Sequence, residues 1–213
     1  MGELTVSTAA CGEFYEKKSR FIGHIAPATT EETAVGFLAQ IKGEHPSATH
    51  HCYAWVIGEN DRLQRSSDAG EPAGTAGRPI LEAIKRRGLH HTIIVVTRYF
   101  GGILLGAGGL TRAYSKAALL AIESAQLVEK IPAKRIALCF DYTLLGKVDT
   151  FLQQQGIQIE NKIFDSKVAY FCLVEESAFP SLPTALSDMS AGQLQMQILE
   201  EHTFLAKNIP FLE

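Results

Sequence analysis

The sequence lacks any long apolar run, and this absence bears on where the protein works. Apolar stretches such as residues 93–96 and 103–105 fall far short of the 18 or so residues that a membrane-spanning helix needs. The N-terminus has no basic segment followed by an apolar one, as a secretory signal peptide would have. We therefore expect a cytoplasmic protein that does not enter a membrane.

Cysteine is scarce and scattered. None of the four forms a C-x-x-C pair, and a chain of 213 residues can build a core without disulfides. The adjacent residues His50 and His51 begin a predicted strand, where they point to opposite faces and do not easily share a metal ion. We expect reduced thiols and no metal site; the thiols belong to Cys11, Cys52, Cys139 and Cys172.

The chain also lacks a strong net charge, with 20 basic and 23 acidic residues. This excludes a protein that coats nucleic acid or an anionic membrane with its whole surface. The charge is uneven, however, because residues 1–133 carry +1 and residues 134–213 carry −4. A local excess lies in residues 78–116, where Glu82 is the one acidic residue and the basic residues are Arg78, Lys85, Arg86, Arg87, Arg98, Arg112 and Lys116.

Apolar residues make up 46% of the chain and charged residues 20%, as in ordinary globular proteins. The length fits one large or two small domains. Pro132 follows the last predicted helix of the first part, so we expect domains at 1–132 and 133–213. The first part predicts strands in 14–25, interrupted near 17–19, and at 51–57 and 91–100. Its helices are predicted at 30–42, capped by Thr30, around 79–84, and at 107–127.

The second part has the order strand, helix, strand, strand, helix, strand. The strands are predicted at 134–142, 157–164, 167–174 and 193–200, with helices at 144–155 and 178–189. This order is that of the ferredoxin-like sandwich. The fold class is therefore α+β, with two domains that each combine a sheet and helices.

Residues 66–79 (SSDAGEPAGTAGRP) are rich in residues that shape a backbone. The carboxylates Asp68 and Glu71 could perform acid–base chemistry or hold a divalent cation. Alternatively, they cap and brace a tight loop before a helix. The other notable residues of this loop are Gly70, Pro72, Gly74, Thr75 and Gly77.

Residues 97–115 (TRYFGGILLGAGGLTRAYS) form a second candidate segment. A strand delivers Arg98, and glycines open the following helix, whose free N–H groups and basic residues Arg112 and Lys116 suit a phosphate. In this interpretation we expect Gly108 at positive φ. The alternative is that the glycines allow close helix-on-strand packing. The segment lacks both the Walker and the dinucleotide patterns, so we expect no cofactor. Its glycines are Gly101, Gly102, Gly106, Gly108 and Gly109.

Residues 17–20 (KKSR) carry three positive charges beside Phe21. They form either a solvated turn or a part of a basic surface, with Phe21 in the core.

Four motifs together resemble one family. KKSRFI at 17–22, HHCYAW at 50–55, DAGEPAGTAGRPIL at 68–81 and TRYFGGILLGAGGLTRAYS at 97–115 are similar to the IMPACT family in its bacterial YigZ-type form. Members often have a second aspartate where this chain has Ala69, which weakens a metal or acid–base role for the loop. The C-terminal pattern is similar to the last domain of elongation factor G.

The resemblance implies a fold and a cellular process in which the protein acts. It implies an N-terminal domain like the fourth domain of elongation factor G, a small-subunit ribosomal protein and the GHMP kinases. Eukaryotic relatives inhibit activation of an amino-acid-starvation kinase by binding its activator protein, but they carry a different appended domain. The implication for this chain is therefore an association with translation.

Three functions follow in order of preference. The first is a non-enzymatic translation regulator that binds RNA or the ribosome through the basic glycine-rich surface. The second is a regulator that binds a protein through its acidic C-terminal domain and the apolar residues 204–205 and 209–212. The third is a nucleotide-binding enzyme with residues 106–109 as its phosphate loop. The sequence leaves open the oligomeric state and whether residues 68–79 and 98–112 face one cleft.

Overall fold

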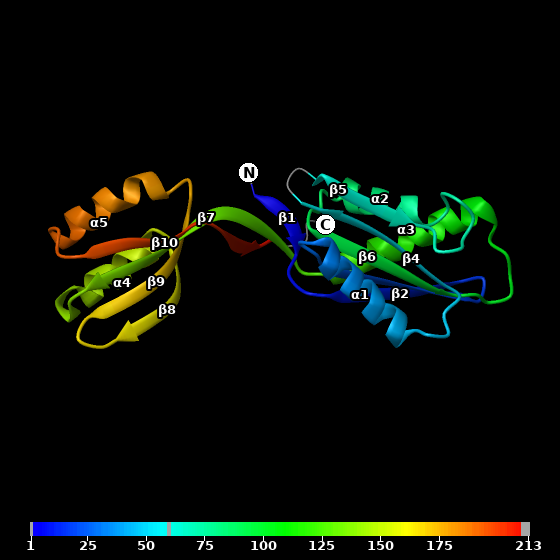
Figure 1. Cartoon of the computed structure of the whole chain (residues 1–213), viewed down its shortest axis with the longest axis horizontal. Coiled ribbons are helices and arrows are strands. Elements are labelled where there is room, and N and C mark those ends of the chain that lie inside the picture. The colour runs from blue at the N-terminus through cyan, green and yellow to red at the C-terminus, as the bar shows by residue number, and fades with distance from the viewer. Residues whose placement is uncertain (1, 59–60, 210–213) are drawn as a thin grey trace. The chain divides into compact units, whose positions relative to one another are not determined.

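The computed structural model describes residues 2–58 and 61–209. It divides into two compact units, built on Glu3–Glu129 and on Lys130–Lys207. Each unit combines a β-sheet with helices, which confirms the expected α+β class (Figure 1).

The N-terminal unit has a five-stranded sheet in which every strand is antiparallel to its neighbours. The sequence predicted the apolar segment 91–100 as a strand, and this strand, β6, lies in the middle with seven of its eight residues buried. In spatial order the strands are β2 (Ala10–Glu16), β3 (Ser19–Pro27), β6 (Thr92–Tyr99), β4 (His50–Ile57) and β5 (Leu63–Ser67).

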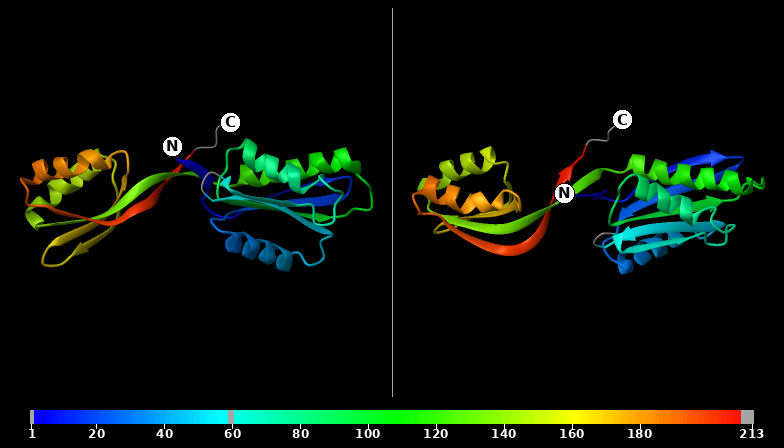
Figure 2. Two further views of the ribbon diagram at one scale, coloured as in Figure 1. Left: turned by 45° about the horizontal axis from the view of Figure 1, so that its top comes forward. Right: turned by 90° about the horizontal axis from the view of Figure 1, so that it is seen from above.

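Helices cover both faces of this sheet (Figures 1 and 2). Helix α1 (Glu31–Glu44) packs on one face, where Trp55 and Ile93 are buried. Helices α2 (Gly77–Arg86) and α3 (Gly106–Ser124) pack on the other. The predicted cap at Thr30 is confirmed, since its side-chain oxygen accepts the Thr33 N–H at 3.2 Å.

Helix α3 lies very close to strands β2 and β3, and two strand glycines make this possible. A Cβ atom at Gly23 would lie 2.2 Å from the carbonyl oxygen of Ala117, and one at Gly12 would lie 2.8 Å from that of Leu120. The sequence analysis gave close helix-on-strand packing as one possible role of the α3 glycines. In the structure, glycines of the strands have this role.

The C-terminal unit has the predicted ferredoxin-like order. Its strands lie in the order β10–β7–β9–β8, and buried residues such as Phe140 and Tyr170 fill the space under its helices. Pro180 and Pro183 lie in the first turns of the last helical segment, as expected. The elements are β7 (Leu127–Phe140), α4 (Leu145–Gln154), β8 (Gln158–Phe164), β9 (Val168–Glu175), α5 (Leu182–Ser190) and β10 (Gln195–Asn208).

Several predicted boundaries were wrong. Pro132 does not end an element but lies inside β7, and β10 extends to Asn208 instead of residue 200. Strand β5 was missed because it is polar and exposed, so it shows no apolar alternation. Strand β1 (Glu3–Val6), which pairs with β7, was also missed.

The predicted apolar tail divides into different environments. Leu205 is buried with Ala133 and Leu173, whereas Phe204 is 55% exposed. The N–H of Ile209 donates to the carbonyl of Leu127 at 3.1 Å, and residues 210–212 lie outside the described part of the chain. Among the described residues, no helix is both long and apolar enough to span a membrane.

His24 is a buried titratable group on the face of β3 that α1 covers. Its ring centroid lies 5.1 Å from that of His45, and its Nε2 has no hydrogen-bond partner in the described chain. Burial, together with the nearby His45, lowers its pKa from 6.5 to about 4.

This shift predicts a loss of stability in mild acid. Because the unfolded chain binds the His24 proton at pH 6.5 and the folded chain only near pH 4, the free energy of unfolding falls as the pH drops through this window. The expected slope from this group is about 1.4 kcal/mol per pH unit. Urea unfolding at pH 7, 6 and 5 should show a shallower decline for His24→Gln than for the wild type. The exposed substitution His202→Gln serves as the control, and equal slopes for the wild type and His24→Gln would contradict the assignment.

Candidate functional site

The loop between β5 and α2 is braced by one carboxylate. Asp68 Oδ1 accepts the N–H groups of Ala76 at 2.9 Å and Gly77 at 2.8 Å, and its Oδ2 accepts that of Gly74 at 2.8 Å. Burial tends to raise the pKa of this carboxyl, but the three backbone hydrogen bonds outweigh burial and lower it. Asp68 therefore has the bracing role that the sequence left as one of two alternatives.

The loop needs unusual backbone geometry. Ala69, Gly70 and Gly74 all have positive φ, and a Cβ at Gly77 would lie 2.7 Å from the backbone of Ser67. The hydroxyl of Thr75 closes the next turn by donating to the Pro72 carbonyl at 2.7 Å. The loop is thus a rigid frame, and the residue it presents is Glu71.

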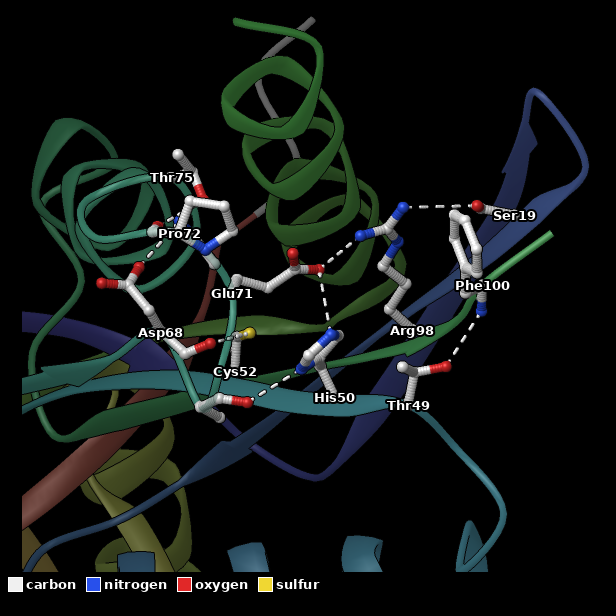
Figure 3. A network of polar contacts seen from close by, with 12 residues as sticks. Ser19, Thr49, His50, Cys52, Asp68, Glu71, Pro72, Thr75, Arg98 and Phe100 are labelled. Atoms are coloured by element: carbon white, nitrogen blue, oxygen red, sulfur yellow. Dashed lines mark hydrogen bonds and ion pairs between the residues drawn. The ribbon is translucent and has the colours of Figure 1, made fainter. Parts of the chain in front are cut away.

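Glu71 is the centre of a buried polar cluster (Figure 3). Its Oε1 accepts Arg98 Nη1 at 2.6 Å and the Tyr114 hydroxyl at 2.7 Å. The Arg98 and Glu71 side chains are 6% and 3% exposed. Burial, followed by neighbouring groups that include Glu71, raises the pKa of Tyr114, which stays protonated as the donor.

Arg98 lies at the end of β6 and is enclosed by aromatic rings. Its guanidinium carbon is 5.3 Å from the ring centroid of Phe21 and 5.4 Å from that of Phe100. Its Nη2 also approaches Ser19 Oγ at 3.5 Å. The sequence assigned Arg98 to a phosphate-binding surface, but its charge is neutralised by Glu71 and buried.

His50 and Cys52 connect the loop to β4. His50 Nδ1 lies 2.9 Å from the carbonyl oxygen of Ala69, and its Nε2 lies 3.9 Å from Glu71 Oε1. The Cys52 thiol donates to the Asp68 carbonyl at 2.9 Å, and burial raises its pKa to about 12. Cys52 is therefore a protonated core thiol and not a nucleophile.

The glycines after β6 have different roles. A Cβ at Gly101 would lie 2.1 Å from the carbonyl carbon of Lys18, so only glycine fits between the loop and the β2–β3 turn. Gly102 and Gly106 have positive φ, at 80° and 69°. Gly108 lies in α3 without positive φ, so the expectation for this residue was wrong, and Gly109 also lies inside the helix.

The two glycine-rich segments meet at one pocket of about 360 Å³. Residues 68–79 and 98–112 therefore do face one cleft. The first segment contributes Glu71 and Pro72 to its wall. The second segment contributes Arg98, Phe100 and Leu104. The wall is completed by Thr49 and His50 and by the start of α3 at Leu105, Gly106, Ala107 and Leu110.

The exposed cations gather in two other hollows, one on each side of α3. A groove of about 460 Å³ between α2 and α3 is lined by Arg78 and Arg86, the hydroxyl residues Thr111 and Ser115, and Glu82. A hollow of about 250 Å³ lies between α3 and β2. Its charged residues are Lys17, Arg112 and Lys116, with Glu16. We call the two hollows together the α3 basic surface.

The cations of this surface form no ion pair with the carboxylates of the described chain. Within residues 2–58 and 61–209, no ion pair involves Lys17, Arg78, Arg86, Arg112 or Lys116. Lys116 instead lies 4.5 Å from the ring centroid of Phe14. In the C-terminal unit, by contrast, Lys134, Arg135, Lys162 and Lys207 each pair with a glutamate or aspartate.

The described chain holds no cluster of three or more His, Cys, Asp or Glu side chains that could bind a metal ion.

Comparison with known proteins places this architecture. Residues 17–122 match the Impact N-terminal domain, and residues 138–193 match a domain of unknown function (DUF1949). The IMPACT family member YvyE of Bacillus subtilis is 43% identical over 90% of this chain and 91% of its own. The chain belongs to the IMPACT family. The Escherichia coli IMPACT family member YigZ is 37% identical over 87% of this chain and 92% of its own.

The IMPACT fold is also represented among solved structures. A crystal structure described as that of a hypothetical protein is 35% identical, with a TM-score of 0.62 over 94% of this chain and 99% of that one. The matched N-terminal domain contains the Glu71–Arg98 pair, the shared pocket and nearly all of the α3 basic surface. Sequence analysis did not identify Tyr114 as a site residue, because its partner Glu71 lies 43 residues away along the chain.

The buried ion pair predicts strong coupling between its two partners. Arg98→Met leaves a buried carboxylate without its cation, so we expect a loss of about 3–5 kcal/mol in the free energy of unfolding. Adding Glu71→Gln should restore part of this loss, because the buried charge is removed while an acceptor for Tyr114 remains. Urea unfolding of both single variants and the double variant gives the coupling energy. The exposed pair of Arg65 and Glu31 is the control, with an expected coupling below about 1 kcal/mol. Additive losses at Glu71 and Arg98 would contradict the coupling.

The bracing of the loop predicts graded effects at Asp68. Asp68→Ala removes the acceptor of three N–H groups, and we expect a loss of about 2–4 kcal/mol. Asp68→Asn keeps one acceptor oxygen and should lose about half as much. Denaturant unfolding measures both, and equal losses for the two variants would show that the carbonyl oxygen does not replace the carboxylate at Oδ1.

Proposed function

We propose that this IMPACT-family protein is a translation-associated regulator that binds structured RNA, on or off the ribosome, through the α3 basic surface. The observation that carries the proposal is the pair of hollows beside α3, whose five cations have no carboxylate partner in the described chain. Exposed cations that no carboxylate neutralises are free to replace the counterions of a phosphate backbone.

The chemistry of the α2–α3 groove supports a phosphate ligand. Arg78 and Arg86 offer planar sets of N–H donors, and the hydroxyl of Ser115 lies on the opposite wall, whereas the Thr111 hydroxyl donates to the Ala107 carbonyl. Guanidinium and hydroxyl groups are common partners of phosphate oxygens in nucleic-acid complexes. Because the carboxylate of Glu82 repels phosphate oxygens, it disfavours a phosphate ligand that fills the whole groove. It favours a ligand that approaches along the rim of the groove.

The turn between β2 and β3 supports the same proposal. Lys17 and Lys18 both have positive φ, at 44° and 67°. Two-residue turns of this kind favour asparagine and glycine, so two lysines there hold their positions at a conformational cost. This cost is understandable where the charge at the tip of the hairpin has a use, and Lys17 does line the hollow with Arg112 and Lys116.

The proposal predicts salt-dependent binding that charge reversal removes. We expect Arg112→Glu/Lys116→Glu to weaken binding of a fluorescent RNA hairpin at least tenfold. We also expect the slope of log affinity against log salt to become shallower by about 1.5–2, because two phosphate contacts are lost. Fluorescence anisotropy between 50 and 200 mM salt, with ribosome co-sedimentation, measures both effects.

A matched control changes the same amount of charge elsewhere. Lys147 and Lys167 lie exposed in the C-terminal unit, and Lys147→Glu/Lys167→Glu should leave affinity and slope nearly unchanged. Equal weakening by both double variants would indicate a nonspecific effect of net charge. If the wild type bound no RNA or ribosome at 50 mM salt, the proposal would be wrong and a protein partner would become the leading function.

A further inference from the structure

The pocket shared by the two glycine-rich segments differs in character from the α3 basic surface. Its two strong charges, Glu71 and Arg98, neutralise each other at 2.6 Å. Much of its wall is apolar, from Phe100, Leu104, Leu105 and Leu110. Its volume of about 360 Å³ lies at the lower end of the range for small-ligand sites, roughly 300–1,000 Å³. A neutral ligand with flat apolar faces suits such a pocket better than a phosphate does.

Two hydrogen-bond acceptors at this pocket have no donor among the residues that the structure describes. Glu71 Oε1 receives both Arg98 and Tyr114, while Oε2 accepts no hydrogen bond from the described residues. His50 Nδ1 lies against a carbonyl oxygen, which can only accept, so Nδ1 carries the proton. In the neutral ring, His50 Nε2 is then an acceptor, and at 3.9 Å it is too far from Glu71 Oε1 for a hydrogen bond (Figure 3).

Hydrogen-bond donors lie on another wall of the same pocket. Helix α3 starts at Gly106 and has no side-chain cap at Leu105. The first N–H groups of a helix have no partner within the helix, so those of Gly106 and Ala107 are available to a ligand oxygen. The pocket therefore offers donors on one side and two acceptors on the other.

Phe100 adds a stacking surface at the rim. One side of its ring covers the guanidinium of Arg98, and the residue is still 45% exposed. An exposed ring beside a polar pocket is the usual platform for an unstacked nucleobase.

From these features we infer that the pocket binds a single unstacked guanine base of the RNA. This inference rests on the proposed function, because the base comes from the RNA that the α3 basic surface would bind. Guanine alone among the four bases presents one acceptor, O6, beside two adjacent donors, N1–H and the 2-amino group. The N–H groups of α3 would meet O6, and Glu71 Oε2 and His50 Nε2 would accept the two donors. The basic surface then supplies affinity, and the pocket supplies base preference.

The test uses the full chain and an RNA hairpin with one unpaired loop guanine. Replacing that guanine by inosine removes the 2-amino donor, and we expect about tenfold weaker binding; adenine, uracil and an abasic site should weaken it at least as much. Phe100→Ala should weaken binding of the guanine hairpin about tenfold and bring it close to the abasic hairpin. Ile103→Ala is the matched control, because Ile103 is exposed in the same loop but does not line the pocket.

A second arm separates the pocket from the basic surface. Free guanosine, which has no phosphate, should shift the NMR signals of His50 and residues 104–107, and inosine should do so more weakly. Arg112→Glu/Lys116→Glu should lower RNA affinity while keeping the preference for guanine. Salt-dependent RNA binding without base preference would overturn the inference and leave the proposed function standing. Guanosine binding without RNA binding would support the pocket and overturn the proposed function.

Discussion

The ion pair between Glu71 and Arg98 is the interaction on which the functional half of the N-terminal unit depends. It joins a loop, a central strand and, through Tyr114, the helix α3, three elements that come from different parts of the chain. Removing one partner of a pair buried this deeply would leave the other charge uncompensated, which is strongly destabilising. The pair therefore ties the two glycine-rich segments together, and both of its residues line the pocket where the segments meet.

The unit treats its positive charges in two opposite ways. Arg98 is buried, paired and covered by two rings, whereas the cations on either side of α3 are exposed and form no ion pair within the described part of the chain. The buried charge of Arg98 stabilises one particular arrangement of the fold. The exposed cations beside α3 create a positive electrostatic potential that can attract a partner. Sequence reasoning counted both as one basic segment, because linear spacing does not distinguish a cation that faces the core from one that faces the solvent.

The predictable parts of the fold are those that depend on residues close together in the sequence. The apolar run of β6, the Thr30 cap of α1 and the alternation of the C-terminal strands each depend on neighbours in the sequence. The site was predictable as a set of segments but not as a geometry. The Glu71 partner of Arg98 lies 27 residues away, and strand β5 is defined by its pairing with β4 and not by its own polar residues.

The position of Gly101 has a consequence for how this domain tolerates change. The backbone of Lys18 and Ser19 occupies the space that any larger side chain at residue 101 would need. The Gly101 N–H also donates to Ser19 Oγ, so the two segments share both a contact surface and a hydrogen bond. Changes in the β2–β3 turn and in the loop at Gly101 are therefore coupled. An insertion that lengthened one of these segments would displace the other. Because the crowding involves backbone atoms of Lys18 and Ser19, it restricts the path of this tip and not the kind of side chain that the tip carries.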